Sequence, residues 1–319
     1  MKEAAFVKQN KARWEEFERV VKGQETADPD RIAALFIQIT DDLSFSRTQY
    51  NDSRTTQYLN ALASKLHLRI YKNKREDKNR FLTFWKEEVP AAVYEARKSL
   101  LYSFIIFIVA GVIGAVSAYY DDTFVRLILG DGYVNMTLEN IKDGKPTDVY
   151  ASMDQTTMFF YITWNNVMVS FRVFVLGVIA SLGTGFYLFY NGLMVGTFMT
   201  FFYQESQLSH ALPVIMLHGT IELTSIVIAG AAGFTMGNSL IFPGTYSRLD
   251  SFKKGAAKGM KIVVGLVPFF FIAGFIESFV TRYAFMHWSL KALIILASAA
   301  LMIYYFVIYP TLLKRNGKI

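Results

Sequence analysis

The stretch from Gln155 to Ser247 carries only three formal charges, on Arg172, Glu205 and Glu222. Soluble domains contain about one charged residue in four, so 93 residues with three charges belong in an apolar environment. The whole chain, at 53% hydrophobic and 18% charged residues, has the same bias. A membrane span needs about 20 mainly apolar residues. The sequence therefore predicts an all-α, polytopic membrane bundle.

The apolar segments divide into about six transmembrane helices. We expect the pair Asn191 and Gly192 to form a tight turn, which makes the third segment either a short span or a re-entrant one. The extracytoplasmic loop is expected at 121–156, after the first span. The predicted spans lie near 99–120, 160–190, 193–208, 211–237, 262–282 and 292–310.

Charge asymmetry predicts how these spans are oriented. Of the 33 lysines and arginines, 19 lie in residues 1–98, and further basic groups surround Lys253 and end the chain. Residues 121–154 instead hold seven acidic against three basic residues. Because cytoplasmic loops are enriched in lysine and arginine, both termini are expected in the cytoplasm of a multi-pass cell-membrane protein.

Residues 1–98 are expected to form a cytoplasmic helical domain, and residues 99–319 the transmembrane domain. Within the first 22 residues, Phe6, Trp14 and Phe17 recur at helical spacing, which is typical of an amphipathic helix. The lysines and arginines here alternate with acidic residues. This alternation favours a solvated surface over a nucleic-acid interface, so no nucleic-acid partner is expected.

A small set of polar residues within the apolar segments forms a candidate cluster. His218 and Glu222 are four residues apart and share one helical face. The favoured interpretation is an ion pair of Arg172 with Glu222 or Glu277, because charges in lipid are normally paired. A proton or ion path and a metal site remain as alternatives, while no cofactor and no catalytic or metal residue is assigned. The cluster comprises Arg172, His218, Glu222, Glu277, Asn165, Asn166 and Asn191.

Small residues within the same segments are expected to pack helices together. Without a hydrophobic force between helices in lipid, close backbone approach at small side chains supplies much of the association. The helix bearing His218 continues its face through small residues at offsets of three and four. The residues expected in helix packing are Gly192, Gly196, Ser225, Ala229, Gly233 and Gly237.

Three separated patterns carry a family resemblance. They are WNNVMVSF...LGTGFYLFYNGLMVG (164–196), HGTIEL (218–223) and VPFFFIAGFIESFVTR (267–282). Together they resemble the stage II sporulation protein M family of integral membrane proteins. The resemblance implies a non-catalytic scaffold or anchoring subunit of a membrane complex linked to the cell envelope at the bacterial inner membrane. The family's namesake works with a cell-wall hydrolase and another membrane protein during spore engulfment.

Two other classes of function stay open at this point. Glycine-interrupted helices near polar residues are typical of a channel or of a proton- or ion-coupled transporter, which would use the buried histidine, glutamates and arginine. An intramembrane metal-dependent hydrolase is a further alternative, although HGTIE lacks the two-histidine HExxH spacing. We therefore expect a non-enzymatic protein whose partners are the lipid bilayer and either other membrane proteins or further copies of the chain.

Overall fold

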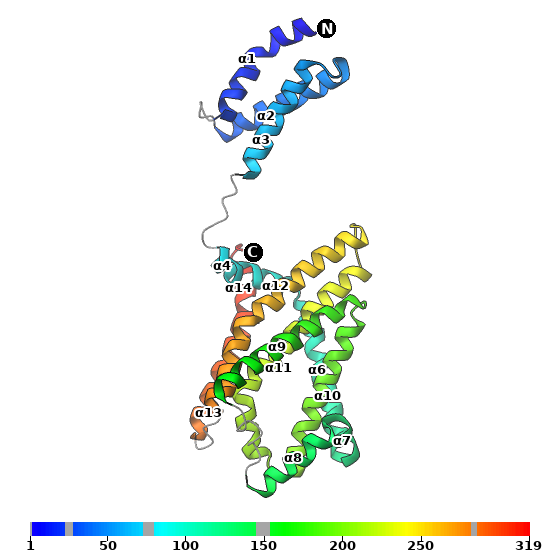
Figure 1. The fold of residues 1–319 in the computed structure, drawn as a ribbon, viewed down its shortest axis with the longest axis vertical. Helices are drawn as coiled ribbons and strands as arrows, with labels where there is room; N and C mark the ends of the chain where they lie inside the picture. Colours follow the sequence, from blue (N-terminus) through cyan, green and yellow to red (C-terminus); the bar gives the residue numbers. More distant parts are fainter. Residues whose placement is uncertain (1, 23–27, 73–79, 145–153, 282–285) are drawn as a thin grey trace. The chain divides into compact units, whose positions relative to one another are not determined.

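The computed structural model describes residues 2–22, 28–72, 80–144, 154–281 and 286–319, and these residues form helices without strands. The predicted all-α fold is confirmed. Two compact units divide the chain, Met1–Arg80 and Phe81–Ile319 (Figure 1). The boundary therefore lies nearer to residue 80 than to the expected residue 98.

The first unit consists of α1 (Glu3–Lys22), α2 (Pro29–Gln49) and α3 (Arg54–Lys72). Apolar side chains spaced by three and four residues along each helix form one core, whose fully buried members include Phe17, Leu35, Ile39 and Leu59. Trp14 lies in this core and its indole Nε1 donates a hydrogen bond of 2.8 Å to Asp42. The unit thus has its own apolar core and its own interhelical hydrogen bonds.

The segment after residue 80 packs with the second unit. It forms α4 (Arg80–Thr83), the π turn η1 (Phe84–Glu88) and α5 (Val89–Glu95). The Tyr305 hydroxyl donates to the carbonyl of Trp85 over 2.6 Å. Lys261 pairs with Glu88 at 2.7 Å. Polar partners from later in the chain thus hold η1 against the bundle, and the composition of residues 81–98 alone did not reveal these partners.

In the described part of the second unit, twelve further elements follow α5. Among the described residues, five helices are both long enough and apolar enough to cross a membrane: α6, α9 with η3, α11, α12 with η4, and α13 continuing to α14. The two most buried of these are α11 and α12. In each, 56% of the residues in the most apolar 18-residue stretch are buried, against 17–22% in the other three helices. The elements are α6 (Arg97–Tyr120), α7 (Asp122–Leu129), α8 (Asp131–Lys142), α9 (Gln155–Val175), η3 (Leu176–Val178), α10 (Leu182–Gln204), α11 (Leu208–Ile241), α12 (Arg248–Phe275), η4 (Ile276–Val280), α13 (Trp288–Ile303), η5 (Tyr304–Ile308) and α14 (Tyr309–Arg315).

The chain reverses between α9 and α10, and not at Asn191–Gly192. Ala180 and Ser181 have φ angles of 46° and 67°, so the turn is made by left-handed backbone there. Asn191 lies in the middle of α10, where its side-chain amide donates 2.7 Å to the carbonyl of Tyr187 one turn earlier. The expected tight turn is therefore wrong, because Asn191 bonds within its own helix and Gly192 packs against α6. The expected boundary between the spans 160–190 and 193–208 is wrong for the same reason.

Helix α10 spans 23 residues without a charged side chain. At 1.5 Å per residue it is about 35 Å long, enough to cross a bilayer. Its most apolar 18-residue stretch has a lower mean hydropathy than those of the five helices above, and its most extensive neighbour is α6. Thr197 of α10 donates a hydrogen bond of 3.4 Å to the carbonyl of Gly114 on α6. The length and packing of α10 are those of a sixth bundle helix.

The acidic segment after α6 contains the short helices α7 and α8, which lie at the opposite end of the bundle from α14 (Figure 1). Val125 of α7 and Val134 of α8 are buried against Phe201 and Phe202 of α10. Their polar faces remain exposed. The expected extracytoplasmic loop 121–156 is thus partly a packed helical cap, with residues 145–153 outside the described part of the chain.

Candidate functional site

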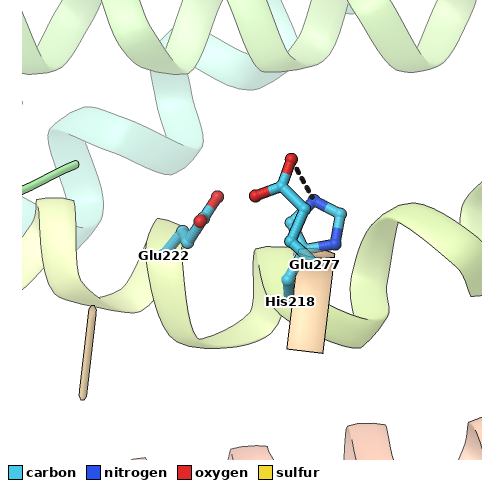
Figure 2. A group of neighbouring side chains, drawn as sticks. All are labelled: His218, Glu222 and Glu277. Carbon is cyan, nitrogen blue, oxygen red and sulfur yellow. Dashed lines mark ion pairs between the residues drawn. The ribbon is translucent and has the colours of Figure 1, made fainter. Parts of the chain in front are cut away.

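The candidate site lies between three elements, α9, α11 and the π turn η4. His218 and Glu222 are one turn apart on α11, so the helical repeat directs both toward the same neighbour. Glu277 lies in η4, which continues α12. Figure 2 shows the carboxylates of Glu222 and Glu277 turned toward each other beside the imidazole of His218.

The side-chain atoms that could bind a ligand converge closely. The Nε2 atom of His218 lies 3.7 Å from an oxygen of Glu277. One ligand atom from each of His218, Glu222 and Glu277 lies within 4.8 Å of the other two. His218 is only 4% exposed and Glu277 only 6% exposed, while Glu222 is half-buried. The site therefore combines one imidazole and two carboxylates in an enclosed position.

Two further side chains position this group. The amide Nδ2 of Asn166 on α9 donates a hydrogen bond to Glu222 Oε1, which joins α9 to α11. The hydroxyl of Thr281 lies 3.5 Å from the other imidazole nitrogen of His218, Nδ1, and also bonds the carbonyl of Ile276 at 3.1 Å. Thr281 follows Glu277 by four residues, so the spacing in ESFVT was a usable signal that sequence analysis missed.

Arg172 lies apart from the cluster. It is exposed on α9, and no ion pair among the described residues includes it. Six residues separate Arg172 from Asn166, which is about 240° around a helix. When Asn166 faces Glu222, Arg172 therefore points to another side. The expected pairing of Arg172 with Glu222 or Glu277 is wrong, since an amide and an imidazole occupy the places beside the two carboxylates.

The remaining asparagines also lie outside the cluster. Asn165 is exposed on α9 beside Asn166. Asn191 is buried in α10 and is satisfied by its own helix. The adjacent pair Asn165–Asn166 thus divides, because neighbouring residues on a helix point about 100° apart.

The predicted small residues lie at the helix contacts. A Cβ atom on Gly196 would overlap the backbone of Gly111 on α6, and one on Gly192 would overlap the carbonyl of Phe107. On α11, a Cβ on Gly233 would collide with Thr184 of α10, and one on Gly237 with the turn at Ser181. Ser225 and Ala229 are fully buried along the same helix. Substituting any of these four glycines would push helices apart.

Four buried hydroxyl groups on the same three elements have no hydrogen-bond partner in the part of the chain that the structure describes. They belong to Thr163, Ser170, Ser225 and Ser278. Thr163 and Ser170 flank Asn166 at helical spacing, Ser225 follows Glu222 by three residues, and Ser278 adjoins Glu277. Unsatisfied hydroxyls in an apolar interior are costly. The site is therefore surrounded by hydroxyl groups whose hydrogen-bonding capacity the described residues do not satisfy.

Chemically, this arrangement can hold a cation or share protons between carboxylates. The hydroxyl of Thr281, which lies 3.5 Å from His218 Nδ1, also donates to the backbone carbonyl of Ile276, so it is not held as a nucleophile is held by its base. The π turn is not diagnostic by itself, because η1 and η5 are π turns as well and meet through Tyr305 and Trp85. The convergence of three ionisable groups distinguishes the site.

Two family profiles match the chain. The family described as Stage II sporulation protein M matches residues 103–282, which include α9, α11 and η4. The family described as Domain of unknown function (DUF8413) matches residues 4–72, within the first unit. Comparison with curated proteins and with solved structures gives no match.

Proposed function

We propose, since the chain belongs to the Stage II sporulation protein M family, that it is a non-catalytic subunit that anchors other proteins in a membrane complex of the cell envelope. One observation carries this proposal. The chain joins a separately packed helical unit, residues 1–80, to a bundle with five helices that can cross a membrane. A membrane anchor bearing its own folded unit is the architecture that recruitment requires.

The first unit has the properties of a binding module. It lies wholly outside the residues that match the Stage II sporulation protein M family and has a family match of its own. Its surface holds ion pairs such as Arg31 with Glu16, at 2.7 Å, so it is built to face water. Because the two units are separately packed, the second can anchor the chain in the membrane while the first binds a partner.

The proposed orientation places both termini in the cytoplasm. With α10 as a sixth crossing, the basic residues before α6, near the start of α12 and after α14 fall on one side. The acidic helices α7 and α8 then fall outside. Support comes from the fold, in which α8 and α14 lie at opposite ends of the bundle (Figure 1). The proposed location is a bacterial inner membrane.

Removal of the first unit tests the anchoring role. The full chain and a variant lacking residues 1–80 are expressed with the same C-terminal tag, cross-linked in membranes and purified. We expect proteins recovered with the full chain to be lost with the shortened variant, while that variant still inserts and elutes as a single species from size exclusion. Recovery of the same proteins without the first unit would refute the proposal that this unit binds them.

A second candidate function is ion- or proton-coupled transport, favoured by the enclosed group His218, Glu222 and Glu277. Ionisable residues inside a membrane commonly mark ion pathways, and the unsatisfied hydroxyls of Thr163, Ser170 and Ser225 would extend one along α9 and α11. Proteoliposomes with an internal pH dye separate the two functions. Dissipation of an imposed proton gradient by the wild type, and not by Glu277→Gln, would favour transport over anchoring.

A further inference from the structure

We propose that His218, Glu222 and Glu277 bind one divalent transition-metal cation, of the Zn²⁺ or Mn²⁺ type, which ties α11 to the end of α12. Two carboxylates that face each other inside an apolar bundle are costly when ionised and unpaired. Arg172 does not balance them, because it is exposed on another face of α9. A divalent cation between the two carboxylates would balance both charges.

The separation of the ligand atoms supports a shared ion. The 3.7 Å between His218 Nε2 and Glu277 Oε1 is too long for a hydrogen bond. Two atoms each about 2.1 Å from a tetrahedral ion are about 3.4 Å apart. The imidazole nitrogen and the carboxylate oxygen thus stand nearly at the spacing of two ligands of one ion. A carboxylate oxygen of Glu222 lies within 4.8 Å of both atoms, and rotation of this side chain would complete a three-residue site.

The surrounding hydrogen bonds resemble those that orient metal ligands. A ligating histidine usually offers its second nitrogen to a neighbouring oxygen, and a ligating carboxylate is itself hydrogen-bonded. Thr281 stands at the Nδ1 atom of His218, on the side away from Glu277. Asn166 donates to Oε1 of Glu222, and the second oxygen of this carboxylate would bind the ion. Each potential ligand on α11 therefore has a positioning partner.

The ligand set indicates the class of metal. Imidazole nitrogen with carboxylate oxygen suits Zn²⁺, Mn²⁺ and Fe²⁺, whereas an all-oxygen set would suit Mg²⁺ or Ca²⁺. Three protein ligands leave a further coordination position. Because His218 and Glu222 come from α11 and Glu277 from η4, the ion would link two central helices.

Metal analysis of the full-length protein in detergent tests this site. The wild type, purified without a polyhistidine tag, is loaded with Zn²⁺, Mn²⁺ or Co²⁺, desalted and measured by plasma mass spectrometry. We expect about one ion per chain, a melting temperature raised by several degrees, and a visible Co²⁺ spectrum with nitrogen and oxygen ligation. Glu277→Gln and His218→Asn should lose at least tenfold in affinity.

Matched controls apply the same chemical changes elsewhere. Glu205→Gln at the end of α10 and His210→Asn, an exposed residue at the start of α11, should bind as the wild type does. A wild type that holds no ion, shows no Co²⁺ spectrum and melts at an unchanged temperature with all three metals would overturn the proposal. Equal binding by wild type and Glu277→Gln would overturn it as well. The wild-type spectrum alone decides the case should a cluster variant fail to fold.

Discussion

Asn166 of α9 donates its side-chain amide to the carboxylate of Glu222 on α11 across the interior of the bundle. Residues in direct contact have coupled effects on stability, whereas distant residues add. We predict that Asn166→Ala and Glu222→Gln are non-additive by about 0.5–3 kcal/mol in a double-mutant cycle of unfolding in detergent.

Arg172→Gln provides the comparison for that cycle. Because Arg172 is exposed on another face of α9, its effect should add to that of Glu222→Gln within about 0.5 kcal/mol. Coupling of Arg172 with Glu222, together with additivity of Asn166 and Glu222, would restore the ion pair expected from sequence and contradict the observed arrangement.

Two glycines of α11 are predicted to respond differently to alanine. A Cβ on Gly233 would collide with the side chain of Thr184 and the carbonyl of Val173, whereas one on Gly219 would meet nothing closer than 3.8 Å. Gly233→Ala should therefore lower the free energy of unfolding by about 1–3 kcal/mol through overpacking. Gly219→Ala should be neutral or slightly stabilising, because alanine favours helix. Thermal unfolding of both variants checks this, and equal effects would mean that α10 does not approach α11 so closely.

Two truncations are predicted to separate the units at residue 80. Removing residues 1–80 should leave the melting temperature of the bundle nearly unchanged, because the first unit has its own core. Removing residues 1–96 should lower it by several degrees, since the hydrogen bond from Tyr305 to Trp85 and the ion pair of Lys261 with Glu88 are lost. If both truncations destabilise equally, residues 81–96 are not part of the bundle.

Membrane orientation can be measured with single cysteines, because the chain has no native cysteine. Exposed or half-exposed positions on each proposed side are Asn51, Glu139, Thr245 and Asn316. From outside the cell, an impermeant maleimide should label only the cysteine at Glu139, because the other three flank basic cytoplasmic segments. Outside labelling at Asn316 with none at Asn51 would indicate five crossings, with α10 not spanning.

The length of the apolar segments was enough to predict an all-α bundle. The first membrane span, expected at 99–120, begins within two residues of the start of α6. The helix boundaries between residues 160 and 208 were not predictable in this way. Asn-Gly is a frequent turn signal, yet Asn191 bonds the carbonyl of Tyr187 and Gly192 packs against α6. The actual turn, at Ala180 and Ser181, contains no glycine. Tertiary packing here overrides the local preference.

The site was predictable as far as helical periodicity reaches. The spacing of His218 and Glu222 places them on one face, and both lie in the cluster. Which residue neutralises or bonds each carboxylate depends on the rotation of α9 about its axis, which sequence spacing does not supply. For that reason Asn166 meets Glu222 while Arg172 does not. The π turn that carries Glu277 has no local sequence signature either.

Photo-cross-linking in living cells tests the anchoring role most directly. A benzophenone amino acid is introduced at Ile37 or Ser44, both exposed on α2, and separately at Leu182 or Phe186, both exposed on α10. The α2 positions should give discrete adducts with another protein, whereas the α10 positions should react with lipid alone. Absence of protein adducts from α2, in a correctly inserted protein whose α10 positions do react, would contradict an anchoring subunit that binds its partners through the first unit.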